Sequence, residues 1–277
     1  MSLRIVTADQ RLAEARGKTT IALFGPTGAG KTSLLKTLPP EPTVCIDLEA
    51  GLKSVQDWRG DSLPIRTFVE ATDVACLIGG ADPAAVDGAD FSRQHYDSVA
   101  HQHPEIAERL AAKDIVFVDS ITDLSRQAMA WAQTQPEAFS ERTGKPDTRG
   151  AYGLVARKVI ALLKHLQHAP GKTVIFVGIL ERVVDDLNRE HWQPQLEGGK
   201  TAREFPGIVD QVISMSLFDR KDGDWRHEPK TGAERRLVCR SGNPFSLPAK
   251  DRSGRLDVTE PADLLALLRK INGVSVS

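Results

Sequence analysis

The chain has 277 residues, 40% of them hydrophobic, and its 36 basic residues balance its 37 acidic ones. A chain of this length and apolar content can bury a sizeable core in one large domain or two small ones. The balanced charge excludes a global electrostatic attraction to nucleic acid or membranes, so any DNA binding must come from a local basic patch. Three widely spaced cysteines form neither a disulfide framework nor a metal knuckle, which favours a reducing compartment.

Nothing in the sequence predicts a membrane segment. The longest apolar stretch, residues 174–180, is far too short to span a bilayer. The first residues lack the apolar core of a signal peptide. We therefore expect no membrane association and a cytoplasmic location.

The first predicted strand, residues 19–24, is a short apolar run that leads directly into a glycine-rich loop. This loop has the pattern G-x-x-x-x-G-K-[ST], and a helix-compatible segment, residues 31–38, follows it before Pro39. A strand, a glycine-rich turn and a helix start in this order are the context in which the pattern binds phosphate. The predicted phosphate-binding residues are Gly25, Pro26, Thr27, Gly28, Ala29, Gly30, Lys31, Thr32 and Ser33.

The chemistry of this loop explains its composition. Its glycines adopt positive φ angles and let the backbone approach a phosphate without a Cβ clash. The amides that follow form an anion-binding nest at a helix N-terminus. Lys31 is predicted to reach the β- and γ-phosphates, and the Thr32 hydroxyl to ligate Mg²⁺. The sequence therefore predicts a site for a nucleoside triphosphate with its magnesium.

Further short apolar runs, residues 44–46, 115–118 and 174–180, are unbroken rather than alternating. Such runs are typical of strands covered on both faces of a parallel sheet. Helical patterns separate them, the clearest one at residues 154–166. Strands that alternate with helices predict an α/β fold with a mainly parallel central sheet.

The last third of the chain changes character. We predict a hairpin at residues 183–192 and short strands at residues 212–218, 236–240 and 244–249. Thr259 and Pro261 are predicted to open a final amphipathic helix. We expect a single domain over residues 1–277, with a core at about 19–218 and a C-terminal antiparallel β extension and final helix at about 219–272.

Two carboxylates are candidates for the hydrolytic chemistry. Asp119 ends the apolar strand at residues 115–118 and is predicted to hold Mg²⁺ through water; the alternative role is a helix cap. In the AAA+ class a Glu directly after this Asp polarises the attacking water, but here Ser120 takes that position. Glu49 follows the strand at residues 44–46, so we predict that it acts as the general base. In the alternative, Asp47 and Glu49 are ordinary carboxylates at a strand end.

These motifs together resemble the RecA-type ATPase core. The resemblance rests on the phosphate loop, on the Asp-x-Glu of Asp47 and Glu49, and on Asp119-Ser120 after a strand, and it runs from about residue 19 to 271. The order of elements is most similar to compact phage proteins that anneal or recombine single-stranded DNA with ATP. The resemblance implies a three-layer P-loop fold, ATP and Mg²⁺ as cofactors, and self-association into a ring or filament, in the host cytoplasm if the protein is phage-encoded.

The resemblance also assigns roles outside the phosphate loop. Lys250 and Arg252 resemble the Lys-x-Arg-x-Gly finger of DnaB- and KaiC-type relatives, which reaches into the neighbouring subunit's ATP site; a solvated hairpin tip is the alternative. Relatives often carry a polar γ-phosphate sensor after the fourth core strand, but this chain has Leu180 there. The nearest polar candidates are Glu181 and Arg182.

Two loops are candidates for binding single-stranded DNA, because RecA-type proteins place their DNA loops in roughly these positions. The first, residues 133–150, carries Arg142, Lys145 and Arg149, and the second, residues 193–203, carries Lys200 and Arg203. Each cation can neutralise a backbone phosphate. The alternative is a pair of solvated, flexible loops.

Two other functions are compatible with the same motifs. In a P-loop kinase for a small molecule, a lid carrying Arg142, Lys145, Arg149 and Arg157 would close over the phosphates. In a nucleotide-gated DNA-binding module, the chain would bind ATP but hydrolyse it very slowly. The missing γ-phosphate sensor near Leu180 favours this alternative. The leading hypothesis is an ATPase that assembles through Lys250 and Arg252 and acts on single-stranded DNA.

Overall fold

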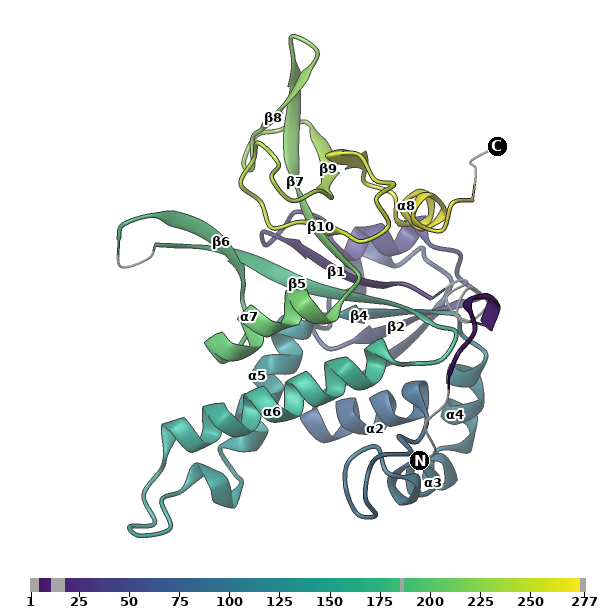
Figure 1. Ribbon diagram of the computed structural model, residues 1–277, viewed down its shortest axis with the longest axis vertical. Coiled ribbons are helices and arrows are strands. Elements are labelled where there is room, and N and C mark those ends of the chain that lie inside the picture. Colours follow the sequence, from purple (N-terminus) through teal and green to yellow (C-terminus); the bar gives the residue numbers. More distant parts are fainter. Residues whose placement is uncertain (1–4, 11–17, 185–186, 275–277) are drawn as a thin grey trace.

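The computed structural model describes residues 5–10, 18–184 and 187–274. A twisted sheet runs through the molecule, with helices on both of its faces (Figure 1). Its strands are β1 (Thr20–Gly25), β2 (Thr43–Asp47), β3 (Asp61–Pro64), β4 (Ile115–Asp119), β5 (Thr173–Val184), β6 (Glu190–Pro194), β7 (Gln211–Lys221), β8 (Asp224–His227), β9 (Glu234–Val238), β10 (Lys250–Asp251) and β11 (Thr259–Pro261). The α-helices are α2 (Phe68–Gly79), α3 (Arg93–Gln102), α4 (Pro104–Ala111), α5 (Ile121–Ala132), α6 (Thr148–Gln167), α7 (Gly199–Ile208) and α8 (Leu264–Ile271). Short 3₁₀ helices are η1 (Thr32–Thr37), η2 (Leu52–Val55) and η3 (Pro136–Ala138).

The strand order β11-β9-β7-β1-β5-β4-β2-β3 confirms the predicted fold class. Strands β7, β1, β5, β4, β2 and β3 pair in parallel. Strands β8, β9, β10 and β11 are joined to the β7 side by antiparallel pairing, and β6 folds back on the end of β5 as the predicted hairpin. The result is a three-layer α/β fold with a mainly parallel sheet and an antiparallel C-terminal extension.

The three layers follow from side-chain alternation along the buried strands. On one face of the sheet, residues such as Phe24, Val118 and Phe176 pack against α2, α5 and α6. On the other face, alternate residues such as Leu23 and Phe117 pack against η1 and α8. Both faces are therefore dry, which explains why the strand sequences are continuous apolar runs.

Parallel pairing places the ends of β1, β2 and β4 at one edge of the sheet. The register pairs Asp47 with Asp119 and Gly25 with Ile179. The glycine-rich loop, which leaves β1 at Gly25, therefore lies at the same edge as both carboxylates. Polar side chains that are far apart in the sequence converge there.

The segment after the glycine-rich loop differs from the predicted helix. It forms the 3₁₀ helix η1 and ends before Pro39, with Leu34 and Leu35 buried. The Thr37 hydroxyl donates a hydrogen bond to the Leu34 carbonyl at 2.6 Å and accepts one from the amide of Leu264 at 3.0 Å. The end of η1 is thus tied to the start of α8.

Two predictions for the C-terminal region are wrong. The predicted strand at residues 244–249 does not form; the Asn243 side chain instead bonds the main chain of Leu247, with Nδ2 donating at 2.8 Å and Oδ1 accepting at 3.3 Å. The final helix does not begin at Thr259, because residues Thr259–Pro261 pair with β9 as β11. Helix α8 begins at Leu264, and the Asp263 side chain caps it.

The predicted boundary near residue 218 falls inside β7, which continues unbroken from the core into the extension. Within the described residues, no helix combines the length and the apolar content needed to cross a membrane.

Candidate nucleotide-binding site

The glycine-rich loop is shaped by close main-chain approaches. A Cβ atom at Gly25 would lie 2.6 Å from the Met215 carbonyl oxygen. Only glycine therefore fits at this position, where the chain leaves β1. Gly30 has a φ of +94°, in the region that side chains disfavour. The sequence therefore builds a loop whose amides, at the start of η1, are free of Cβ obstruction.

Lys31 lies at the mouth of this loop. Its ammonium donates hydrogen bonds to the carbonyls of Gly25 at 2.9 Å and Pro26 at 3.0 Å. Burial lowers the pKa of Lys31, while the nearby Asp119 and Glu49 act in the opposite direction. The loop thus presents one partly desolvated cation next to its anion-binding amides.

Thr32 and Asp119 form the predicted metal-binding pair. The Thr32 hydroxyl donates a 2.6 Å hydrogen bond to Asp119 Oδ2. Asp119 is only 2% exposed, and its other oxygen, Oδ1, is buried and has no hydrogen-bond partner in the described part of the chain. Burial raises the pKa of Asp119 to about 6, against the hydrogen bond from Thr32. A buried carboxylate oxygen without a partner beside a hydroxyl fits a hard divalent cation such as Mg²⁺, either directly or through water.

Glu49 faces the same space as Lys31. A cavity of about 280 Å³ is lined by Thr27, Gly28, Gly30, Lys31, Thr32, Ser33, Glu49, Ser54, Ile179 and Arg235. Burial, and then the negative charge of Asp123, raise the pKa of Glu49, while Lys31 opposes the shift. A carboxylate with raised proton affinity next to the phosphate loop suits a proton acceptor.

Asp47 has a structural role that separates it from Glu49. Its Oδ1 accepts a hydrogen bond from the Gly51 amide at 3.3 Å, and Arg66 binds its carbonyl at 2.8 Å. Ser120 is a helix cap: its hydroxyl accepts from the Asp123 amide at 3.3 Å and donates to the Asp123 carboxylate at 2.6 Å. Neither residue lines the cavity, which leaves Glu49 as the strand-end acid that does.

In the described part of the chain, no polar residue of β5 lines the cavity at the sensor position. Leu180 is 3% exposed, and its neighbour Ile179 is the β5 residue that lines the cavity. Glu181 accepts a hydrogen bond from Gln193 at 3.1 Å, and Arg182 pairs with Glu190, both across the β5–β6 ladder. The two polar candidates are therefore used in the hairpin and not in the cavity.

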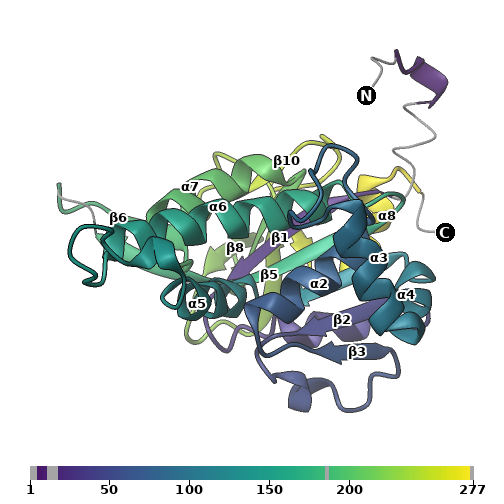
Figure 2. The ribbon, with the colours of Figure 1, turned by 90° about the horizontal axis from the view of Figure 1, so that it is seen from below.

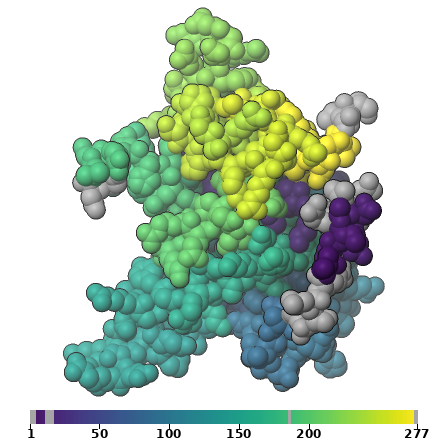
Figure 3. Space-filling model, in the orientation of Figure 1, coloured from purple at the N-terminus to yellow at the C-terminus, as the bar shows by residue number. Residues whose placement is uncertain are grey.

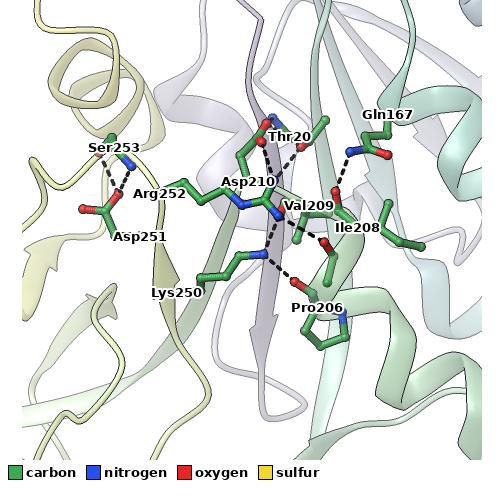
Figure 4. A network of polar contacts seen from close by, with 11 residues as sticks. Thr20, Gln167, Pro206, Ile208, Val209, Asp210, Lys250, Asp251, Arg252 and Ser253 are labelled. Carbon is green, nitrogen blue, oxygen red and sulfur yellow. Dashed lines mark hydrogen bonds and ion pairs between the residues drawn. The ribbon is translucent and has the colours of Figure 1, made fainter.

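Lys250 and Arg252 lie at the opposite edge of the sheet from the glycine-rich loop. Lys250 is in β10 and pairs with Val212 near the start of β7, and Arg252 directly follows β10. The start of β7 is level with the start of β1. Figure 4 shows the Lys250 ammonium donating to the carbonyls of Pro206 and Val209, both at 2.6 Å. Arg252 binds the Asp210 carboxylate at 3.2 Å. Within one chain, both cations therefore hold the C-terminal end of α7, and the role in a neighbouring subunit stays a prediction.

The candidate DNA loops lie on one side of the molecule. Their cations are all exposed: Arg142, Lys145, Arg149, Lys200 and Arg203. The predicted loop at residues 133–150 contains η3 and the bridge between Phe139 and Pro146, and its last residues already belong to α6. The second predicted loop continues into α7, where Lys200 and Glu204 form an i,i+4 ion pair at 3.8 Å.

The second candidate segment lies beside α6, the helix that follows the first one. A Cβ atom at Gly198, before α7, would lie 3.7 Å from the ring of Tyr152 on α6. Figures 1 and 2 show α7 beside α6, with the tip before α6 projecting beyond it, and Figure 3 shows that tip as a protrusion of its own. The carboxyl edge of the sheet thus carries both the nucleotide cavity and a set of exposed cations.

Sequence reasoning missed Arg235, which lines the nucleotide cavity from β9. A Cβ atom at Gly30 would lie 2.8 Å from Arg235 Nε. No motif contains this arginine, and it directly precedes the predicted strand at residues 236–240. Only the pairing of β9 with β7, and of β7 with β1, shows that it reaches the loop.

A family model described as an AAA domain matches residues 17–253. The chain belongs to this AAA domain family. The match covers the phosphate loop, Glu49, Asp119, Lys250 and Arg252. The sequence and the geometry therefore identify the same ATPase-type domain. A search of curated proteins found no match.

Solved structures show weaker likenesses. A type III secretion system ATPase of pathogenic bacteria has 16% identity and a TM-score of 0.37, over 72% of this chain and 52% of that one. The ATPase domain of G40P has 13% identity and a TM-score of 0.32, over 80% and 76% of the two chains. The RadB recombinase has 13% identity and a TM-score of 0.33, over 85% and 91%. This chain spans about half the length of the secretion ATPase.

The raised pKa of Asp119 predicts a specific dependence of stability on pH. Between the ordinary value of 3.8 and about 6, the folded chain holds a proton at Asp119 that the unfolded chain has released. Stability contributed by this group is present at low pH and is lost as the pH rises through this window. Relative to Asp119→Asn, the wild type should lose at most about 3 kcal/mol of unfolding free energy between pH 4 and pH 7.

Urea denaturation in the presence of a chelator measures this difference. The exposed Asp222→Asn variant is the control, because its turn conformation accepts asparagine. A wild-type-minus-Asp119→Asn difference that does not change with pH would contradict the assignment of the shift to this buried carboxyl.

Proposed function

We propose that this chain is an ATP hydrolase. The observation that carries the proposal is the convergence on one carboxyl edge of the Lys31 ammonium, the Thr32–Asp119 pair and the Glu49 carboxylate. The loop amides and Lys31 bind the phosphates, and Thr32 and Asp119 hold the Mg²⁺. When bound, the metal ion would supply positive charge that offsets the negative charge of the phosphates.

Glu49 is the proposed proton acceptor for the attacking water. The water oxygen forms a bond to the γ-phosphorus while the bond to the β–γ bridging oxygen breaks. ADP leaves with that electron pair, and Glu49 accepts the proton of the water. The raised pKa of Glu49 favours this transfer because a more basic carboxylate takes up a proton more readily.

Two observations bear on the alternative functions. The kinase lid requires Arg157 near the phosphates, but Arg157 lines a different cavity, together with Asp90 and His165. The nucleotide-gated module with little ATP turnover remains the competing proposal. Its support is that the β5 residue lining the cavity is Ile179, whose side chain cannot sense a γ-phosphate by hydrogen bonding. The requirement for Glu49 distinguishes it from the hydrolase.

Single-stranded DNA is the proposed polymer on which the ATPase acts. The support is that residues 193–203 lie beside α6, the helix that follows the first candidate loop, and that the five candidate cations are all exposed. Exposed Phe139 and Tyr152, 40% and 42% exposed, lie in the same region and provide rings on which bases can stack. Nucleotide binding and DNA binding would then share one edge of the sheet.

Self-association, in a ring or a filament, is proposed with Lys250 and Arg252 entering the neighbouring subunit's site. Their placement at the edge away from their own phosphate loop is compatible with a partner's site, since they cannot serve the loop of their own chain. In this proposal they must leave the carbonyls at the end of α7 when subunits assemble.

Glu49→Gln should reduce the turnover of ATP by at least about 100-fold while leaving ATP affinity within about threefold. The amide keeps the size of the side chain but cannot accept the proton. Phosphate release and equilibrium binding measure the two quantities. The exposed Glu41→Gln variant is the control, and unchanged turnover in Glu49→Gln would favour the module that does not depend on hydrolysis.

The DNA proposal predicts a change in salt dependence. If Arg142, Lys145 and Arg149 each neutralise one phosphate, their triple alanine variant should lower the slope of log affinity against log salt by about 2 for single strands. Fluorescence anisotropy with a labelled oligonucleotide at several salt concentrations measures it. A triple alanine variant of the exposed Lys221, Lys230 and Arg240 is the control, and equal slopes in both variants would refute the assignment.

Complementation tests the role of Lys250 in a neighbouring subunit. A mixture of Lys250→Ala and Glu49→Gln chains should hydrolyse ATP faster than either variant alone, because one interface then combines an intact Glu49 with an intact Lys250. Thermal unfolding of Lys250→Ala alone reports its contribution to the end of α7. A mixture with only the average activity of its parts would leave Lys250 with the intrachain role alone.

A further inference from the structure

Arg235 reaches the phosphate loop from a strand that is distant in the sequence. Strand β9 pairs with β7, which in turn pairs with β1, and the register places Arg235 opposite Leu217. At Gly30, a Cβ atom would lie 2.8 Å from Arg235 Nε and 3.0 Å from Cζ. The guanidinium therefore packs against the main chain of the loop itself, and a side chain at position 30 would displace it.

In the described part of the chain, Arg235 has no polar partner. Its side chain is exposed, and within the described residues it has no hydrogen bond or ion pair. The next residue, Arg236, shows how an arginine is used structurally: its side chain is 13% exposed, pairs with Glu234 at 3.0 Å and lies 4.4 Å over the Trp225 ring. An unpaired guanidinium held against an anion-binding loop is thus free to bind an anion.

Arg235 stands where two cavities adjoin. The first, of about 280 Å³, contains Lys31 and Glu49. The second, of about 540 Å³, lies between η1 and strands β7 and β9, with Leu34, Met215 and Leu217 among its lining residues. Both are lined by Gly30, Ser33 and Arg235. A nucleotide with its terminal phosphate near Glu49 and its nucleoside in the second cavity would place its α- and β-phosphates beside Arg235.

We propose that Arg235 binds the α- and β-phosphates of the nucleotide within its own chain. This inference rests on the proposed function, because it extends the same site. Arg235 and Lys31 are the cationic residues that line the first cavity. The planar guanidinium can bind two phosphate oxygens at once, whereas Lys31 acts as a point charge. The ligand class is a nucleoside di- or triphosphate, and not a free nucleoside.

The position of Arg235 fixes the expected kinetic pattern. Contacts to the α- and β-phosphates exist equally in ATP, in ADP and in the transition state of hydrolysis. Their loss therefore weakens binding without changing the rate at saturation. Arg235→Ala should weaken binding of both ATP and ADP by about tenfold or more, with kcat within about threefold of the wild type. Arg235→Lys should recover part of the affinity, because lysine restores the positive charge but cannot bind two phosphate oxygens at once as a guanidinium does.

Calorimetric titration with ADP and with a non-hydrolysable ATP analogue, together with steady-state ATP hydrolysis, tests this. Arg226→Ala is the matched control, since Arg226 is an exposed arginine on strand β8, which also pairs with β7, and lies outside both cavities. Equal affinities for Arg235→Ala and the wild type would overturn the inference. Loss of ATP affinity and kcat with unchanged ADP affinity would also overturn it, because that pattern belongs to a γ-phosphate contact. If the wild type bound no nucleotide at all, the proposed function itself would fail.

Discussion

The short hydrogen bond between Thr32 and Asp119 is the contact on which the site depends. It joins the glycine-rich loop after β1 to the end of β4, two strands that are separated by β5. Parallel pairing and register bring these strand ends level, and the loop spans the remaining distance. Without that register, the hydroxyl and the carboxylate would not meet, and no pair of oxygen ligands would lie beside Lys31.

Burial of the same site has an electrostatic cost, which the hydrogen bond from Thr32 opposes at Asp119. A buried carboxylate and a partly buried ammonium are both costly to keep charged, and burial shifts their pKa values in opposite directions, up for Asp119 and down for Lys31. A triphosphate with a divalent cation would add both the negative charge that Lys31 favours and the positive charge that Asp119 favours. The attraction between Lys31 and Asp119 does not fully offset the cost of their burial, and perturbed pKa values of this kind are typical of functional sites.

The sequence predicted the features that local chemistry dictates. The core strands are recognisable because both sheet faces are covered, and the loop because its glycines avoid main-chain clashes such as that of Gly25 with Met215. The predicted strand at residues 244–249 is wrong because the Asn243 side chain bonds the main chain in place of a neighbouring strand, which leaves Leu247 buried without a ladder. Arg235 was missed because its proximity to Gly30 arises only from the pairing of β9, β7 and β1. The intrachain contacts of Lys250 likewise depend on where α7 ends, which no local pattern records.

The central claim is that Lys31 and the loop amides hold the phosphates of a nucleotide. Equilibrium binding of a non-hydrolysable ATP analogue with Mg²⁺ to Lys31→Ala tests it most directly, with Lys36→Ala as the control, because Lys36 lies on the same short helix and pairs with Asp57. The account predicts that Lys31→Ala weakens binding by at least about tenfold while Lys36→Ala leaves it unchanged. Wild-type affinity in Lys31→Ala would contradict it.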